Sequence, residues 1–117
     1  MNMNKTINEV LQQLRIPRRY KGYFQTLAAV RLVLEDEKRL QAVFKEVYWV
    51  VADECSCNPN TIERNIRFVV LNVWNNNREY LNKIAGFCLP ARPTVSQFIE
   101  IIASHIQRSK EKANETK

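Results

Sequence analysis

The residues best suited to contact a partner chemically lie between positions 60 and 67, where polar side chains interrupt an apolar stripe. At about 100° per residue, Arg64 and Arg67 fall on the side of a helix opposite to its apolar residues. Arginine can donate two hydrogen bonds to one guanine, and glutamate can accept one from the cytosine amino group. The pattern predicts base reading in DNA, with a solvated helix face carrying an Arg–Glu pair as the alternative. The candidate readout residues are Asn60, Thr61, Glu63, Arg64 and Arg67.

A second group of cations lies in a connector near the N-terminus. Arg15, Arg18, Arg19 and Lys21 occur there with no acid among them. We expect these side chains to contact phosphates, and a solubilising loop is an equally weighted alternative. The whole chain carries 18 Lys and Arg against 12 Asp and Glu, a formal net charge of +6. That balance favours a polyanionic partner, nucleic acid first and an anionic membrane surface second.

Several kinds of chemistry lack the residues that they need. The chain has only two glycines, so it has no Gly-rich phosphate loop. His105 is the only histidine, and Cys55 and Cys57 have no partners at metal-ligand spacing. We expect these two cysteines, and Cys88, to be apolar core residues. The sequence therefore predicts no metal, no cofactor and no enzymatic activity.

The apolar spacing predicts helices along nearly the whole chain and no strand. Six helices are expected, the first ending at Pro17. The third starts at the acids 35–37, and the others cover about 23–34, 59–74, 78–85 and 95–107. The start and stop signals are capping boxes at Thr6 with Glu9 and at Thr94 with Gln97, an N-cap at Asn58 before Pro59, and a stop at Gly86.

Only residues 56–58 separate the third and fourth helices. A helix, a tight turn and a second helix at a steep angle form the DNA-binding helix-turn-helix. Ser56 stands where this turn usually has glycine. We expect another helix to cover Phe68 and Leu71, which face outward, and to leave the first two turns free for a groove. The residues assigned to packing are Val51, Ala52, Cys55, Cys57 and Ile62 in the motif, and Trp49, Trp74, Tyr80 and Phe87 elsewhere.

Over about residues 7–107 the sequence resembles the DNA-binding effector domains of sporulation response regulators, the family of stage-zero sporulation protein A. This resemblance implies an all-α fold of six helices with a helix-turn-helix, in agreement with the helix count above. The stretches that carry it are Ile16-Pro17 with Lys21-Gly22-Tyr23, Ile62-Glu63-Arg64-Asn65-Ile66-Arg67 continuing to Trp74, and Arg92-Pro93-Thr94 with Phe98-Ile99.

The resemblance also implies which residues meet DNA. The family reads a short box of the TGTCGAA type through the second motif helix, and Glu63, Arg64 and Arg67 match residue types that it keeps there. Asn60 stands where the family has a small polar residue. Thr61 replaces a family arginine expected to reach a guanine, a contact worth roughly 1–3 kcal/mol of discrimination. We therefore expect the box of this chain to differ.

These patterns predict one domain over residues 1–107 and a polar, disordered tail over 108–117. The family's N-terminal receiver has no counterpart in the sequence, so the chain is either a natural stand-alone regulator or an excised domain. Its longest apolar run, Val47-Tyr-Trp-Val-Val-Ala52, is far below the roughly 18 residues of a membrane span. No secretion signal begins the chain, so we expect a cytoplasmic protein with no membrane partner.

Two functions remain open. The first is a sequence-specific transcription regulator that binds double-stranded DNA, with the sigma subunit of RNA polymerase and a second copy on tandem boxes as further partners. The second is a receiver-less interaction module or decoy that pairs with a full-length regulator or with RNA polymerase. In the second case Arg64→Ala would leave activity intact.

Overall fold

The computed structural model describes residues 2–115, and the side chains of residues 2–113. This described part contains six α-helices, one 3-10 segment and one π segment, and no strand. The all-α fold predicted from the sequence is confirmed. The elements are α1 (Met3–Gln13), α2 (Lys21–Glu35), η1 (Glu37–Ala42, 3-10), η2 (Phe44–Tyr48, π), α3 (Trp49–Cys55), α4 (Pro59–Asn76), α5 (Arg78–Ala85) and α6 (Val95–Glu115).

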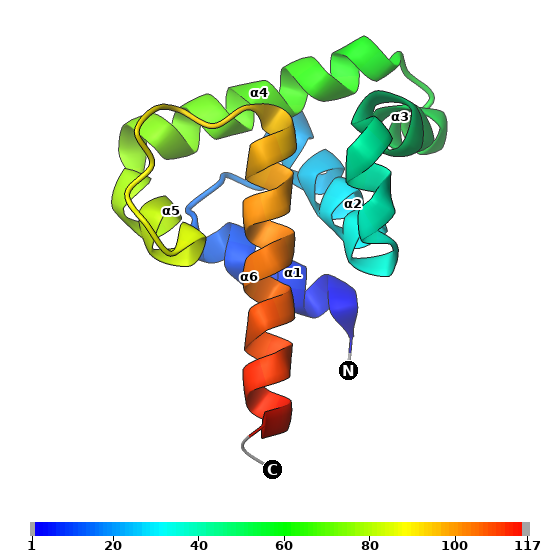
Figure 1. The fold of residues 1–117 in the computed structure, drawn as a ribbon. Helices are drawn as coiled ribbons and strands as arrows, with labels where there is room; N and C mark the ends of the chain where they lie inside the picture. The colour runs from blue at the N-terminus through cyan, green and yellow to red at the C-terminus, as the bar shows by residue number, and fades with distance from the viewer. Residues whose placement is uncertain (1, 116–117) are drawn as a thin grey trace.

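Helices α2 and α6 pack side by side at the centre of the molecule, and the other elements surround them (Figure 1). In Figure 1, α4 lies across one end of this pair and α1 crosses it toward the other, while α3 flanks α2. The apolar stripes expected for these helices meet in one core, in which Tyr23 of α2 and Phe98 of α6 are fully buried. Placing α4 at the end of the molecule leaves one of its sides open to solvent.

Three of the local signals in the sequence set helix boundaries as predicted. The Asn58 side chain accepts a hydrogen bond from the Asn60 amide (2.8 Å) and caps α4. Gly86 ends α5 at φ 89°, a conformation that glycine adopts without a Cβ penalty. Thr94 and Gln97 form the predicted capping box through reciprocal bonds of 2.9 and 3.1 Å.

The predicted start of α1 was wrong. The side chain of Asn2 accepts a hydrogen bond from the Asn4 amide (3.0 Å), so the helix begins at Met3. The expected capping box of Thr6 and Glu9 therefore lies inside the helix. Asparagine is as good an N-cap as serine and better than threonine, which explains why the earlier residue begins the helix.

Helix α6 continues to Glu115, beyond residue 107, where the disordered tail was expected to begin. The added turns are rich in good helix formers and contain neither glycine nor proline. Arg108 also ties this part of the helix to α5, because its guanidinium donates to the carbonyl of Ile84 (2.8 Å). Residues 116–117 of the expected tail lie outside the described part.

The expected third helix is divided into η1, η2 and α3. Asp36 caps its start by accepting from the Lys38 amide (3.1 Å), as the acids at 35–37 had suggested. Arg39 then reaches forward to donate to the carbonyl of Glu46 (2.6 Å). The segment that departs from regular α-helix geometry, residues 37–48, thus contains a hydrogen bond from a side chain to a backbone carbonyl.

Helices α2 and α4 approach each other closely at Gly22. A Cβ built on Gly22 would lie 2.6 Å from Cγ2 of Val69 and would overlap the carbonyl oxygen of Asn65. Beside this contact the Asn65 amide donates to the buried Gln25 (3.0 Å), which satisfies two polar groups between the helices. The absence of a side chain at residue 22 thus fixes how near α4 lies to the rest of the fold.

Candidate nucleic-acid interface

Helices α3 and α4 are joined by a tight turn at residues 56–58. Ser56 adopts the left-handed conformation (φ 54°, ψ 46°), and the Cys57 amide donates back to the carbonyl of Ala52 (3.0 Å). These features form a left-handed helix C-cap. Ala52 is buried, as expected for the small residue where two motif helices touch. The arrangement is consistent with the predicted helix-turn-helix.

The five candidate readout residues all lie in the first half of α4, but they are not equally accessible. Asn60, Arg64 and Arg67 are exposed, whereas Thr61 and Glu63 are half-buried. Their apolar counterparts on the other side of the helix are fully buried. The exposed side of α4 thus presents two guanidinium groups, with an amide one turn before Arg64.

Glu63 is turned toward two neighbours within the protein. Its carboxylate lies 3.4 Å from the Arg67 guanidinium, one helical turn along α4. Burial, together with the negative charge of Glu63, raises the pKa of Tyr48 to about 12, so this phenol stays neutral at physiological pH. The carboxylate therefore lies between the exposed arginine and η2. From this position Glu63 orients Arg67, and it is less free to meet a base than the sequence suggested.

The basic connector between α1 and α2 is held in place by aromatic rings. The Arg18 guanidinium lies 5.5 Å from the ring centre of Phe24, and that of Arg19 lies 5.6 Å from the ring centre of Tyr20. Arg15, with a positive φ of 63°, ends α1 in the left-handed conformation. All four cations of the connector are exposed.

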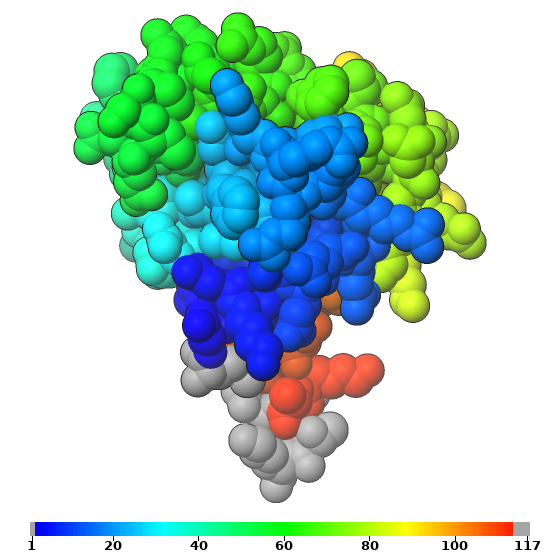
Figure 2. All heavy atoms as spheres, turned by 180° about the vertical axis from the view of Figure 1, so that it is seen from behind, coloured from blue at the N-terminus to red at the C-terminus, as the bar shows by residue number. Residues whose placement is uncertain are grey.

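The basic connector and the exposed side of α4 meet beside Arg64. Arg64 shares a shallow pocket of about 370 Å³ with Tyr20, Lys21, Gly22 and Phe68. Figure 2 shows the connector and the start of α2, in blue, directly below the green α4. The fold therefore brings Lys21 and Arg64 to one surface, although 43 positions separate them in the chain (64 − 21 = 43).

Phe68 was expected to be covered by another helix, and this expectation was wrong. Phe68 is 56% exposed and Leu71 is 37% exposed. Phe68 packs only partly, with its ring centre 5.2 Å from that of Tyr20. The connector and the start of α2 pack beside Phe68 but leave its outward side open. The outward position of Phe68 on the helical stripe was the signal that could have marked it as a surface residue.

Several residues assigned to the core are on the surface instead. Cys55, Cys57 and Cys88 are free and exposed, and Trp49 and Phe87 are 56% and 60% exposed. The turn geometry explains the first two, since the left-handed cap at residue 56 directs its flanking residues away from the α3–α4 contact. Trp74 and Tyr80 are half-buried and pack against the core as expected.

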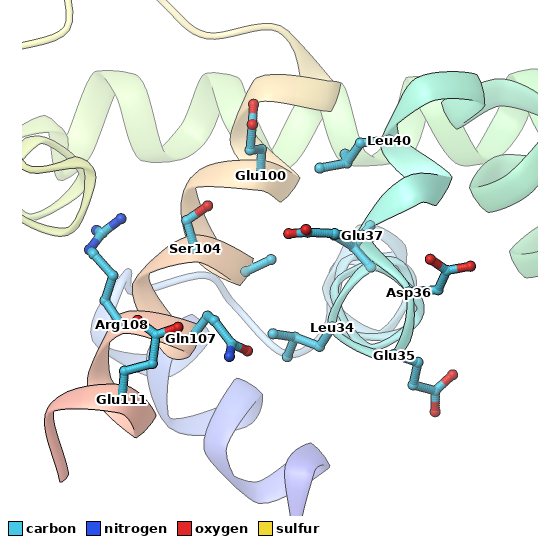
Figure 3. A pocket seen from close by; sticks show the side chains of 12 residues that line it. Leu34, Glu35, Asp36, Glu37, Leu40, Glu100, Ser104, Gln107, Arg108 and Glu111 are labelled. Carbon is cyan, nitrogen blue, oxygen red and sulfur yellow. The ribbon is translucent and has the colours of Figure 1, made fainter. Parts of the chain in front are cut away.

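A larger groove lies on a different surface, between α6 and the segment joining α2 to η1 (Figure 3). It encloses about 650 Å³, with Leu34 and Leu40 among its apolar residues. Glu37 points across the groove toward α6, while Glu35 and Asp36 point away from it. The acidic residues around the groove are Glu35, Asp36, Glu37, Glu100 and Glu111, and Arg108 is the cation among them. Acidic side chains therefore outnumber cations around this groove, in contrast to the connector.

Other kinds of site find little support in residues 2–115. This part of the chain holds no cluster of three or more histidine, cysteine or acidic side chains arranged to bind a metal ion. None of the described helices has both the length and the apolar character needed to cross a bilayer.

The chain matches a known protein family. The family model described as "Sporulation initiation factor Spo0A C terminal" matches residues 7–106, almost the whole chain. The match includes the connector, the turn at residues 56–58 and all of α4. The family is one of regulatory domains and not of enzymes.

Proposed function

The chain belongs to the sporulation initiation factor Spo0A C-terminal family, and we propose that it is a sequence-specific regulator of transcription whose helix α4 enters the major groove of DNA. The observation that carries the proposal is the pair of exposed guanidinium groups of Arg64 and Arg67 at the start of α4. A major groove about 12 Å wide admits one α-helix, and the first turns of the second motif helix meet the base edges.

The readout residues divide into two groups by their surroundings. Arg64 has no acidic partner within ion-pair distance among the described residues, so it is available for a bidentate contact with guanine. Arg67 is paired with Glu63, so a contact of its guanidinium with a base competes with this ion pair. Asn60 is placed to meet a base or a phosphate at the first turn. Thr61 cannot replace the forked contact of the arginine that the family has at this position, so the preferred box departs from TGTCGAA there.

The connector supplies contacts to the DNA backbone. Lys21 lies beside Arg64, and Arg18 and Arg19 are held over aromatic rings on the same side of the molecule. These three residues, with Arg15, would neutralise phosphates on the strand next to the groove. Each neutralised phosphate steepens the slope of log K against log salt by about 0.9. A regulator of this kind acts in the cytoplasm, and the sigma subunit of RNA polymerase is its candidate protein partner.

The test is a binding-site selection from random duplexes at a defined salt concentration, followed by titration of the selected site and a scrambled duplex. Arg64→Ala should weaken binding to the selected site about tenfold or more and relax the preference at one base pair, since a bidentate contact is lost. Lys112→Ala removes one positive charge at the far end of α6 and serves as the matched control. It should preserve the preference at every base pair.

Two results would contradict the proposal. One is equal affinity of the parent protein for the selected and scrambled duplexes. The other is an unchanged base preference in Arg64→Ala. Either result would favour the alternative, a module that binds a full-length regulator or RNA polymerase. Combined substitution of Arg18 and Arg19 by alanine tests the connector separately: the salt slope should flatten while the sequence preference stays the same.

A further inference from the structure

An aromatic side chain continues the exposed ridge of α4 beyond Arg64. Phe68 lies four residues later, one turn along the helix, and more than half of its surface is open to solvent. An exposed phenylalanine side chain is unfavourable in water, because burial of its apolar surface would lower the free energy. Its position next to a proposed base-reading arginine calls for a partner that offers an apolar group.

The ring of Phe68 is supported from one side only. Tyr20 packs against it at 52° between ring planes, and the Tyr20 hydroxyl accepts a hydrogen bond from the Asn72 amide (3.4 Å). The Arg19 guanidinium lies against the same tyrosine ring. Phe68 is therefore buttressed by a fixed neighbour while its other side remains open.

The charges around the ring select the kind of partner. Lys21 and Arg64 line the same shallow pocket as Phe68, and Arg19 is adjacent through Tyr20. An apolar protein surface docked here would leave these cations without counter-charges. DNA supplies phosphates for the cations and also one apolar group on its major-groove edge, the C5 methyl of thymine.

We propose that Phe68 reads the methyl group of a thymine next to the base pair contacted by Arg64. The proposal rests on the proposed function and deepens it. Four residues of α-helix advance about 6 Å, which is less than two base-pair steps of about 3.4 Å, so the base pair next to the one read by Arg64 lies within reach of Phe68. Phenylalanine is a known contact of the thymine methyl group.

The experiment replaces each thymine of the selected site by uracil, one at a time. This change removes only the C5 methyl group and keeps every hydrogen-bonding atom. At one position, adjacent to the base pair whose preference Arg64→Ala relaxes, the parent protein should lose about fourfold in affinity, the value expected for exposing one buried methyl group. Phe68→Ala should bind the thymine and uracil duplexes equally well, while Phe68→Leu should retain part of the difference.

The matched control is Phe87→Ala, since Phe87 is a similarly exposed phenylalanine (60%) outside the pocket next to Arg64. This variant should keep the full difference between thymine and uracil. The proposal is overturned if no uracil substitution changes the affinity of the parent protein, or if Phe68→Ala keeps the difference. In both cases selective binding through Arg64 could still stand. Failure of the protein to select any site would instead reject the proposed function together with this inference.

Discussion

Replacing Gly22 by alanine should destabilise the protein, because the new methyl group has no space between α2 and α4. The added Cβ would lie 2.6 Å from Cγ2 of Val69 and would overlap the Asn65 carbonyl oxygen. Backbone atoms cannot rotate away, so the two helices must separate. Overpacking of this kind costs about 1–3 kcal/mol, and a rigid neighbour puts the cost toward the upper end. Alanine recovers part of it through its higher helix propensity.

The net loss of unfolding free energy is thus about 2 kcal/mol, equivalent to a fall in Tm of about 8 °C for a domain of this size. Thermal unfolding followed by circular dichroism would measure it. Gly86→Ala is the control without a clash: Gly86 has a positive φ of 89° but no atom within 4 Å of a built Cβ, so only backbone strain of about 1–2 kcal/mol applies, and Val69→Ala should not change that loss. Val69→Ala should lower the unfolding free energy less in the Gly22→Ala protein than in the parent protein, since in the first case it removes one of the two clashes. A Gly22→Ala protein that melts within 2 °C of the parent would refute the reasoning.

Three further predictions follow from other parts of the fold. Ser56→Gly should raise the unfolding free energy by about 0.5–1 kcal/mol in chemical denaturation, because a non-glycine residue is strained in the left-handed turn; a loss of stability would show that Ser56 makes an undetected contact. Burial and the nearby Arg108 lower the pKa of His105 below its usual value, so the unfolded chain binds the proton more readily and stability should fall as the pH drops below about 6.5. His105→Gln should flatten this dependence, and equal pH profiles would contradict it. The free protein should sediment as a monomer and pair only on DNA with two adjacent boxes, where neighbouring sites raise the effective concentration of a weak contact; a tight dimer without DNA, or independent filling of the two boxes, would count against pairing.

The features that could be predicted from the sequence depend on partners a few residues apart. Asn58 caps an amide two positions later, and Thr94 and Gln97 exchange hydrogen bonds across three. Gly86 ends its helix through its own backbone freedom. Each of these needs only the local chain, so the residue types and their spacing were enough to place α4, α5 and the start of α6.

Two of the features that were missed depend on contacts between distant segments, and the exposure of two cysteines accompanies a local turn. Nothing near Gly22 in the sequence reveals that Asn65 will lie against it, although this contact sets the position of α4. Phe68 was expected to be covered by another helix. Its ring packs instead on Tyr20 of the connector, 48 positions earlier in the chain (68 − 20 = 48), which covers only part of it. Cys55 and Cys57 were assigned to the core because they flank the turn at packing positions of the motif, whereas both are exposed beside the left-handed Ser56.

For the candidate site, the sequence identified the helix and its polar residues but not their surroundings. Periodicity separated Arg64 from the buried stripe of α4. It could not show that Glu63 faces both Arg67 and Tyr48, nor that Lys21 arrives next to Arg64. These relations arise from tertiary packing, in which the start of α2 and the start of α4 are brought together.

The acidic groove of Figure 3 has a consequence for the way the protein meets a polyanion before any specific contact forms. The groove lies between α6 and the end of α2, whereas the connector and the start of α2, in blue in Figure 2, lie beside α4. We expect this separation of acids and cations to add an electric dipole to the net charge of +6. In the field of a DNA duplex, the partner that we propose, such a dipole would experience a torque that turns α4 and the connector toward the phosphates during diffusion. We expect the acids thereby to raise the fraction of collisions that begin with α4 facing the duplex. This effect weakens as salt shortens the Debye length to about 8 Å, well below the dimensions of the molecule.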